Sequence, residues 1–325
     1  MRYRTLGGTG LCVSQLGLGT MPFGDGTDED EAAAIVAACL DVGINLFDCA
    51  DVYAGGRSET ILGRLIAPVR DDVVLATKVG FPSAEGVNRR GTSAAHIRLS
   101  VEGSLMRLGT DRIDLYYLHR FDPRTDLDHT LRTLDALVTA GKILHIGVSN
   151  FAAWQVATAL GRSTLHGWAP IVAIQPMYNL IKRQVEVELL PLAASADLAV
   201  FPYSPLAGGL LTGKYGATPG DGEGRLVTNP MYRSRYRDEA GFAAAAALTG
   251  LAGDAGCHPA TLAVAWVASH PAVTAPLIGG RTLEQLRPSL AAVEFDLDEE
   301  LRGRISALTP EPPPPTDRSE QSAAD

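Results

Sequence analysis

Three polar residues interrupt or end apolar runs of this sequence and a tyrosine follows one of those runs, and the types of all four suit proton transfer. Lys78 lies inside the run Val73–Val79, where a snorkelling surface lysine is a poor explanation if both faces of a strand are covered. Asp48 ends another run and is a candidate partner, because a buried ammonium needs a carboxylate. Tyr53 follows shortly after, and a nearby cation lowers the pKa of a phenol and makes it a usable general acid. His119 ends a third run.

Each of these residues also has a structural interpretation. Asp48 is a candidate helix cap or turn residue, Tyr53 a packing residue in a loop, and His119 a hydrogen-bonded core histidine. The functional interpretation of all four therefore depends on whether the fold brings them together.

The chain alternates short apolar runs with helical patterns, and this alternation predicts where those residues lie. The runs expected to form strands are Gln15–Thr20, Ile44–Asp48, Val73–Val79, Ile113–His119, Ile143–Ser149, Ile171–Pro176, Leu198–Tyr203 and Val273–Gly279. Helical patterns cover Glu29–Asp41, Ser58–Ile66, Ser93–Leu108, a leucine stripe from Leu127 to Leu137, Ala152–Leu160, Val185–Ala196, Pro259–Ser269 and Leu283–Ala292. Eight strand–helix units predict an α/β fold, a (β/α)8 TIM barrel.

An open doubly wound sheet is the alternative fold. Its dinucleotide-binding turn needs a third glycine after Gly17-Leu18-Gly19, and Pro22 stands at that position. The barrel interpretation places the carboxyl ends of all the strands at one rim, where barrel active sites lie. Polar or aromatic residues end seven of the runs, namely Asp48, Lys78, His119, Ser149-Asn150, Gln175, Tyr203 and Gly279-Gly280-Arg281. Seven such ends at one rim indicate a site.

The last of these ends is suited to an anion. Its glycines let the backbone approach a ligand, a helix start presents N–H groups, and Arg281 adds a guanidinium fork for a phosphate. The alternative is simple capping, because Thr282 and Gln285 match the S/T-x-x-Q capping box.

Three segments fall outside the eightfold unit. Residues 3–13 predict a small β-hairpin that turns at its glycines. The long loop after strand seven, about Pro205–Asp238, predicts a functional lid or a disordered segment. Residues 310–325 are Pro-rich and then polar, so we expect a disordered tail after a single barrel domain over residues 1–309.

Composition excludes several classes of protein. The 325 residues are 46% hydrophobic and 20% charged, which is typical of a globular protein and not of a disordered chain. A net charge of −9 argues against nucleic acid or an anionic membrane as the main partner. No apolar run approaches a membrane span and no signal peptide is evident, so we expect a cytoplasmic protein.

Metal and serine-nucleophile chemistry lack their sequence signatures. The seven histidines show no H-x-x-x-H or H-E-x-x-H spacing, and no G-x-S-x-G is present. The four cysteines are scattered, without a C-x-x-C pair, and are expected to pack as small hydrophobic residues. We expect no metal at the site.

Several segments in order resemble the signature segments of the aldo-keto reductase superfamily. They are Phe47-Asp48-Cys49-Ala50-Asp51-Val52-Tyr53, Leu75-Ala76-Thr77-Lys78, Asp114-Leu115-Tyr116-Tyr117-Leu118-His119, Gly147-Val148-Ser149-Asn150-Phe151, Gln175-Pro176-Met177-Tyr178-Asn179 and Tyr203-Ser204-Pro205-Leu206. The resemblance extends from Tyr3 to about Leu308, and it is nearest to the bacterial branch that is similar to potassium-channel β-subunits.

This resemblance implies a barrel that binds NADPH, with a catalytic tetrad of Asp48, Tyr53, Lys78 and His119. It implies cofactor contacts from Ser149, Asn150 and Gln175 to the nicotinamide amide, from Tyr203 to its ring, from Ser204, Leu206, Gly208 and Lys214 to the pyrophosphate, and from Gly279, Arg281 and Gln285 to the 2′-phosphate end. Cys49 stands where the family usually has threonine, and Ser289 stands where an asparagine usually reads the adenine.

The implied function is NADPH-dependent reduction of a small aldehyde or ketone to an alcohol, with Tyr53 as the proton donor. Two other classes stay open. A cofactor-bound regulatory subunit with little turnover would keep the same motifs. A phosphate-binding lyase or isomerase barrel would instead use Lys78 as a Schiff-base amine.

Overall fold

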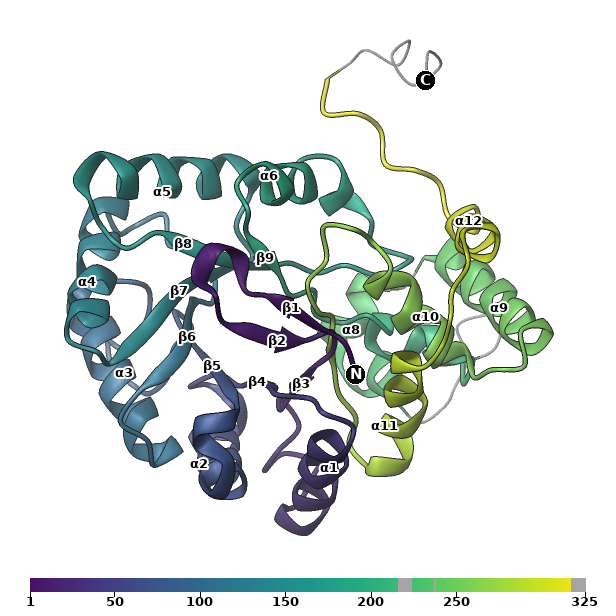
Figure 1. Cartoon of the computed structure of the whole chain (residues 1–325), viewed down its shortest axis with the longest axis horizontal. Helices are drawn as coiled ribbons and strands as arrows, with labels where there is room; N and C mark the ends of the chain where they lie inside the picture. The colour runs from purple at the N-terminus through teal and green to yellow at the C-terminus, as the bar shows by residue number, and fades with distance from the viewer. Residues whose placement is uncertain (216–223, 237, 317–325) are drawn as a thin grey trace.

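A computed structural model describes residues 1–215, 224–236 and 238–316. Its central sheet is parallel and has the strand order β10-β3-β4-β5-β6-β7-β8-β9 (Figure 1). These strands are β3 Gly17–Gly19, β4 Leu46–Asp48, β5 Val74–Val79, β6 Ile113–Leu118, β7 Ile143–Ser149, β8 Ile171–Gln175, β9 Ala199–Val200 and β10 Leu277–Ile278. Backbone hydrogen bonds from Ala275 N to Val200 O and from Leu277 N to Pro202 O join β9 to β10 and close the sheet. The predicted (β/α)8 barrel and its eight strands are confirmed.

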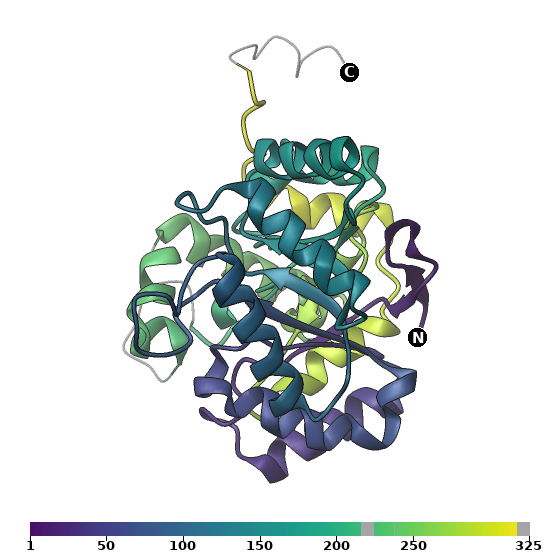
Figure 2. The same cartoon turned by 90° about the vertical axis from the view of Figure 1, so that its left-hand side faces the viewer.

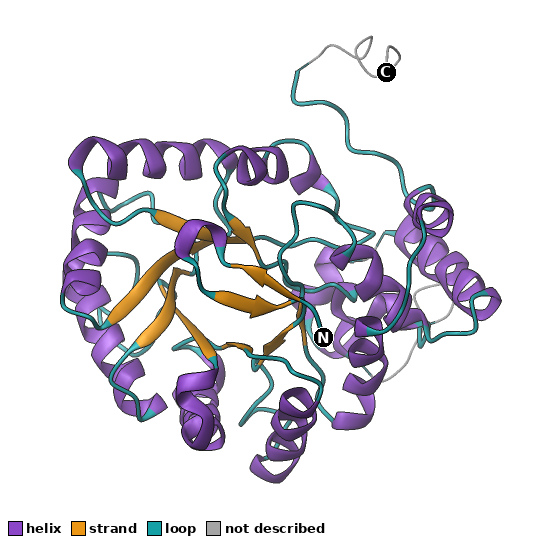
Figure 3. Cartoon of the chain, in the orientation of Figure 1, coloured by secondary structure: helices purple, strands orange, loops and turns teal. Residues whose placement is uncertain are grey.

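Helices surround the strands on the outside of the barrel (Figures 2 and 3). They are α1 Glu29–Asp41, α2 Arg57–Ile66, α3 Ala94–Leu108, α4 Leu127–Thr139, α5 Ala153–His166, α6 Leu189–Ser195, α7 Arg225–Thr228, α8 Pro230–Arg235, α9 Glu239–Asp254, α10 Pro259–Ala268, α11 Leu283–Leu290 and α12 Glu299–Ser306. The sequence did not indicate α9 or α12. The Ala-rich α9 lacks a clear apolar stripe, so its periodic signal is weak.

The barrel has two apolar layers. Side chains inside the barrel, including Leu46, Leu115 and Tyr117, form one buried cluster, and a larger cluster fills the space between strands and helices. All six residues of β5 are buried, as expected for a strand covered on both faces. Lys78 is therefore carried into the protein interior by its own strand.

The predicted hairpin is present as β1 Tyr3–Thr5 paired antiparallel with β2 Cys12–Ser14. Leu6 and Val13 from this segment join the cluster inside the barrel. Gly7 packs close to Val172 O, at the start of β8. The hairpin thus closes the N-terminal end of the barrel and leaves the opposite rim for function.

The sequence predicted a functional lid or a disordered segment over about Pro205–Asp238, and the described part of this segment contains regular structure. Its described part contains a 3₁₀ turn at Ala207–Thr212 and the short helices α7 and α8, while residues 216–223 and 237 lie outside the described residues. Residues 310–316 contain no helix or strand, and the remainder of the expected tail, 317–325, also lies outside the described residues. No described helix has the length and apolar composition needed to cross a membrane.

Candidate active site

Lys78 is the centre of a buried hydrogen-bond network at the C-terminal rim. Its ammonium donates to a carboxylate oxygen of Asp48 and, at 2.6 Å, to the carbonyl oxygen of Cys49. The same nitrogen lies 3.4 Å from the hydroxyl of Tyr53. Gln175 donates its amide N–H to the second oxygen of Asp48 at 2.7 Å. The predicted ion pair is present because β4 and β5 are neighbours whose register sets Asp48 beside Ala76, two residues before Lys78.

The ion pair keeps Lys78 charged. Burial by itself would lower the pKa of Lys78, but the negative charge and hydrogen bond of Asp48 outweigh burial and raise the pKa above its ordinary value. A Schiff-base lysine needs a lowered pKa, so that the neutral amine is available. This environment disfavours the lyase or isomerase alternative.

Burial and the charge of Lys78 shift the pKa of Tyr53 in opposite directions. Burial raises the pKa of Tyr53 to about 12, and the nearby Lys78 opposes this rise without reversing it. Lys78 thus lowers the pKa of this phenol, as expected, but burial has the larger effect and the net shift is upward. The phenol stays protonated at neutral pH, as a proton donor must be.

His119 directly follows β6 and faces the same space. Its ring meets the edge of Phe81 at 4.7 Å and lies 6.0 Å from the ring of Tyr53, between centroids. Burial, together with the charges of Lys78 and Arg120, lowers the pKa of His119 to about 2. The imidazole is therefore neutral at physiological pH and is a hydrogen-bonding group rather than a cation.

A chain of hydrogen bonds links the ends of β7, β8 and β9. Tyr203 donates to the side-chain oxygen of Asn150 at 2.7 Å, and Asn150 donates to the carbonyl oxygen of His119 at 2.9 Å. Ser149 donates to the carbonyl oxygen of Gln175 at 2.8 Å. Four of the residues expected to hold the nicotinamide are thus brought together. One of the two amide N–H groups of Gln175, however, is already bonded to Asp48.

The residues expected along the pyrophosphate follow Tyr203 in one tight turn. Ser204 has a positive φ of 58°, and its carbonyl oxygen accepts a 2.9 Å hydrogen bond from Asn179. Leu206 precedes the 3₁₀ turn, and Gly208 has a φ of +67°, where an added Cβ would lie 2.6 Å from the ring of Tyr232. The ammonium of Lys214 lies 5.0 Å from the ring centroid of Tyr215.

The turn after β10 combines the two interpretations given for it. Thr282 accepts from Gln285 N at 3.3 Å, and the side-chain oxygen of Gln285 accepts from Arg281 N at 3.2 Å, so Gln285 does cap the helix start. The carboxylate of Glu31, from α1, accepts from Leu283 N. Fewer backbone N–H groups are therefore free to bind an anion at this turn than the sequence suggested. The exposed guanidinium of Arg281 is the main group left to bind one. Gly279 approaches the backbone of β3, since an added Cβ would lie 3.0 Å from Gly19 O.

Ser289 does not line an open groove. Its side chain is fully buried in α11, and its hydroxyl oxygen has no hydrogen-bond partner among the described residues. Adenine recognition by this residue is not supported by its position. Sequence reasoning also gave no role to Asn179, although it stands at the end of the segment Gln175-Pro176-Met177-Tyr178-Asn179 and holds the turn at Ser204.

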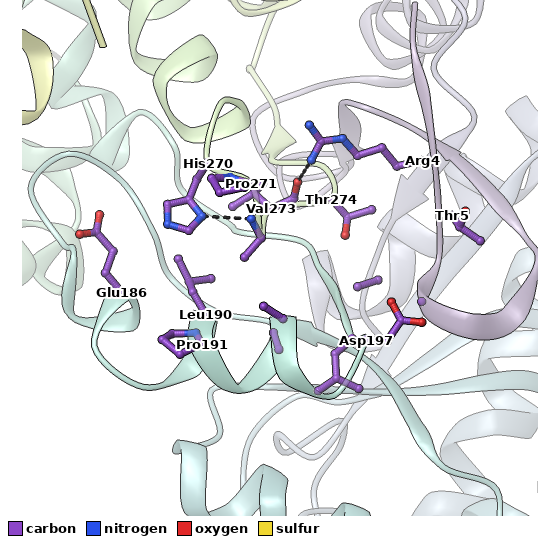
Figure 4. Close-up of a pocket in the computed structure, with 16 residues that line it drawn as sticks. Arg4, Thr5, Glu186, Leu190, Pro191, Asp197, His270, Pro271, Val273 and Thr274 are labelled. Carbon is purple, nitrogen blue, oxygen red and sulfur yellow. Dashed lines mark hydrogen bonds between the residues drawn. The ribbon is translucent and has the colours of Figure 1, made fainter. Parts of the chain in front are cut away.

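A separate cavity of about 440 Å³ lies at the other end of the barrel (Figure 4). It is lined by residues that precede β9 and β10, such as Asp197 and Thr274, and by Arg4 of the hairpin. None of the predicted site residues lines it. Among the described residues, no group of three or more His, Cys, Asp and Glu side chains could hold a metal ion.

Comparison with known proteins agrees with the barrel fold. The Aldo/keto reductase family matches residues 15–309, so the chain belongs to this family of oxidoreductases. It is 40% identical over 323 residues to the "Uncharacterized oxidoreductase YrpG" of Bacillus subtilis (strain 168), covering 96% of this chain and 97% of that protein.

Two further relatives have different names. The "Probable voltage-gated potassium channel subunit beta" of Oryza sativa subsp. japonica is 37% identical over 321 residues, covering 96% of this chain and 94% of that protein. The "Aflatoxin B1 aldehyde reductase member 2" of Rattus norvegicus is 37% identical over 295 residues, covering 85% of this chain and 79% of that protein. Such relatives agree with the branch that the sequence resembles.

Proposed function

We propose that this protein reduces an aldehyde or ketone to an alcohol with NADPH, and that Tyr53 is the proton donor. The observation that carries the proposal is the hydroxyl of Tyr53, 3.4 Å from an ammonium that is itself buried and paired with Asp48. The phenol is protonated in the resting protein, and it stands beside a fixed positive charge that stabilises the phenolate left after proton transfer.

The remaining residues of the tetrad have distinct tasks. Asp48 holds Lys78 in place and keeps it charged, and Gln175 and the carbonyl oxygen of Cys49 complete the bonds of this pair. His119 is neutral and donates a hydrogen bond to the substrate carbonyl oxygen. Proton transfer from a positioned group contributes about 10²–10⁴-fold to a reaction rate.

The residues around the rim fit a nicotinamide dinucleotide. Tyr203 offers an aromatic face, and Ser149 and Asn150 offer polar groups beside it. Arg281 and Lys214 have no carboxylate within 4 Å among the described residues, so their charges are available to phosphate groups. When bound, NADPH supplies the hydride that reduces the carbonyl carbon.

A direct test is to follow NADPH absorbance with the purified protein across aldehydes, ketones, quinones and sugars. Turnover with at least one class is expected, and it should survive prolonged chelation and dialysis because no metal is assigned a role. A loss of activity that zinc or another divalent ion restores would contradict this mechanism. The proposal includes a single barrel domain over residues 1–309 and a cytoplasmic protein that acts on small molecules, without nucleic acid or membrane as a partner.

A regulatory subunit is the second candidate. It is favoured by the relative named as a probable potassium channel subunit beta, which is similar over nearly the whole chain. Tight NADPH binding with negligible turnover, together with a partner protein that copurifies, would support this candidate over the enzyme.

A further inference from the structure

Arg120 directly follows His119 at the end of β6 and has no task in the site described so far. Its side chain is exposed at the rim. Among the described residues, no carboxylate lies within 4 Å of its guanidinium, and its side chain makes no hydrogen bond. The charge is therefore free to act on a ligand.

The guanidinium is nevertheless held in a defined place. Its central carbon lies 4.5 Å from the ring centroid of Phe81, as in a cation–π contact. The same ring meets the imidazole of His119 at 4.7 Å, so Phe81 links the two groups. The charge of Arg120 also reaches His119 and, after burial and Lys78, helps to lower its pKa. The guanidinium thus lies beside the group expected to bind the substrate carbonyl.

Two other arginines, Arg124 and Arg107, are instead paired with carboxylates. Arg124, four residues further along the same loop, lies 3.5 Å from a carboxylate oxygen of Asp122. Arg107 is bound to Glu59 at 2.6 Å. The whole chain has a net charge of −9, and what distinguishes Arg120 from the exposed Arg281 is its place beside Phe81 and His119.

We propose that Arg120 determines substrate specificity by pairing with a carboxylate on the carbonyl compound, so that short acidic aldehydes or ketones are preferred over neutral ones. His119 binds the carbonyl oxygen, and Arg120 binds the carboxylate through its planar guanidinium. Phe81 holds that guanidinium in place through the cation–π contact. This inference rests on the proposed function and names the substrate class for the same site.

The test compares two aldehydes of the same shape, 4-carboxybenzaldehyde and the neutral 4-nitrobenzaldehyde, with Arg120→Gln and Arg120→Lys variants. The ratio of their kcat/KM values should favour the carboxylated compound, and Arg120→Gln should lower that ratio about 10-fold or more, mainly through KM. Arg120→Lys should lower the ratio less than Arg120→Gln does, because the positive charge remains. It should still lower the ratio, because the two-pronged contact of the guanidinium is lost. Arg124→Gln is the matched control, since it removes a paired charge from the same loop and should leave the ratio as it was.

A binding measurement separates this inference from the proposed function. The non-reacting 4-methylbenzoate is titrated by calorimetry into the protein saturated with NADP⁺, and Arg120→Gln should weaken its affinity by a similar factor. If no aldehyde is reduced but benzoate binding depends on Arg120, the proposed function fails and the anion site stands. The inference is overturned if Arg120→Gln changes neither the ratio of kcat/KM values nor the affinity for 4-methylbenzoate. It is also overturned if the variant weakens NADPH binding by the same factor as 4-methylbenzoate binding.

Discussion

The two ends of the proposed site are built in opposite ways. Around Lys78 the charges are buried and already satisfied by Asp48, Gln175 and the backbone of Cys49. At the turn after β10, the N–H groups are capped by neighbouring side chains, but the guanidinium of Arg281 is exposed. The difference indicates that the fold itself preorganises the chemical end, whereas the phosphate end depends on a ligand to complete its contacts.

Asp48 and Asp51 show the same contrast within one short segment. Asp48 is bonded through both carboxylate oxygens, while both oxygens of the equally buried Asp51 lack a hydrogen-bond partner among the described residues. Burial, with the neighbouring Glu59 carboxylate, raises the pKa of Asp51 to about 7 although Arg107 opposes this rise. Burial raises the pKa of Asp48 as well, but the charge and hydrogen bond of Lys78 and the hydrogen bond of Gln175 oppose that rise. A pKa near 7 leaves the carboxyl group of Asp51 partly protonated at neutral pH.

The largest expected effect concerns Tyr53. Tyr53→Phe removes the hydroxyl beside Lys78 and should lower kcat by about 10²-fold or more, while NADPH affinity changes by no more than a few-fold. Steady-state kinetics and a fluorescence titration of NADPH measure the two quantities. Turnover close to that of the unaltered protein would remove Tyr53 from the mechanism.

The buried pair itself is the next target. Lys78→Met leaves the carboxylate of Asp48 without its cation and should cost about 3–5 kcal/mol of unfolding free energy. The double variant Lys78→Met with Asp48→Asn should recover part of this loss, because no uncompensated charge remains. Urea unfolding measures both. An equally large loss in the double variant would show that packing, and not the unpaired charge, dominates.

Arg281 tests the exposed end. Arg281→Ala should lower the affinity for NADPH by roughly 10- to 150-fold and leave the affinity for NADH almost unchanged, because only NADPH carries the 2′-phosphate. The guanidinium takes no part in the cap, so the melting temperature should stay nearly constant. Thr282→Ala is the control, since it removes a capping oxygen and should lower stability. Equal losses for the two cofactors in Arg281→Ala would contradict a phosphate role.

Asp51 gives the smallest and most pH-dependent effect. A folded-state pKa near 7, above the unfolded value of about 3.9, means that stability is lost as pH rises between these values. An asparagine side chain does not titrate, so the unfolding free energy of Asp51→Asn relative to that of the unaltered protein should rise by about 2.6 kcal/mol from pH 5 to pH 8. Unfolding free energies measured at both pH values check this. A difference independent of pH would mean that Asp51 is ionised throughout.

Local patterns in the sequence were sufficient for the architecture of the barrel. Short apolar runs bounded by turns predicted all eight strands. The long segment before α9 was not predictable in this way, because its short helices are stabilised by contacts such as those of Tyr232 with the preceding turn. The buried ion pair could be proposed from Lys78 inside an apolar strand, since burying that charge demands a partner.

By itself, the sequence determined which residues end the strands and therefore which side chains share one rim, because strand direction and period are local properties. Only the tertiary structure decided how those side chains are used. Gln175 bonds Asp48, Glu31 reaches from α1 to the start of α11, and Phe81 holds Arg120 beside His119. The net rise in the pKa of Tyr53 was likewise decided by the tertiary structure, because the balance between burial and the charge of Lys78 depends on atoms that are far apart in the chain.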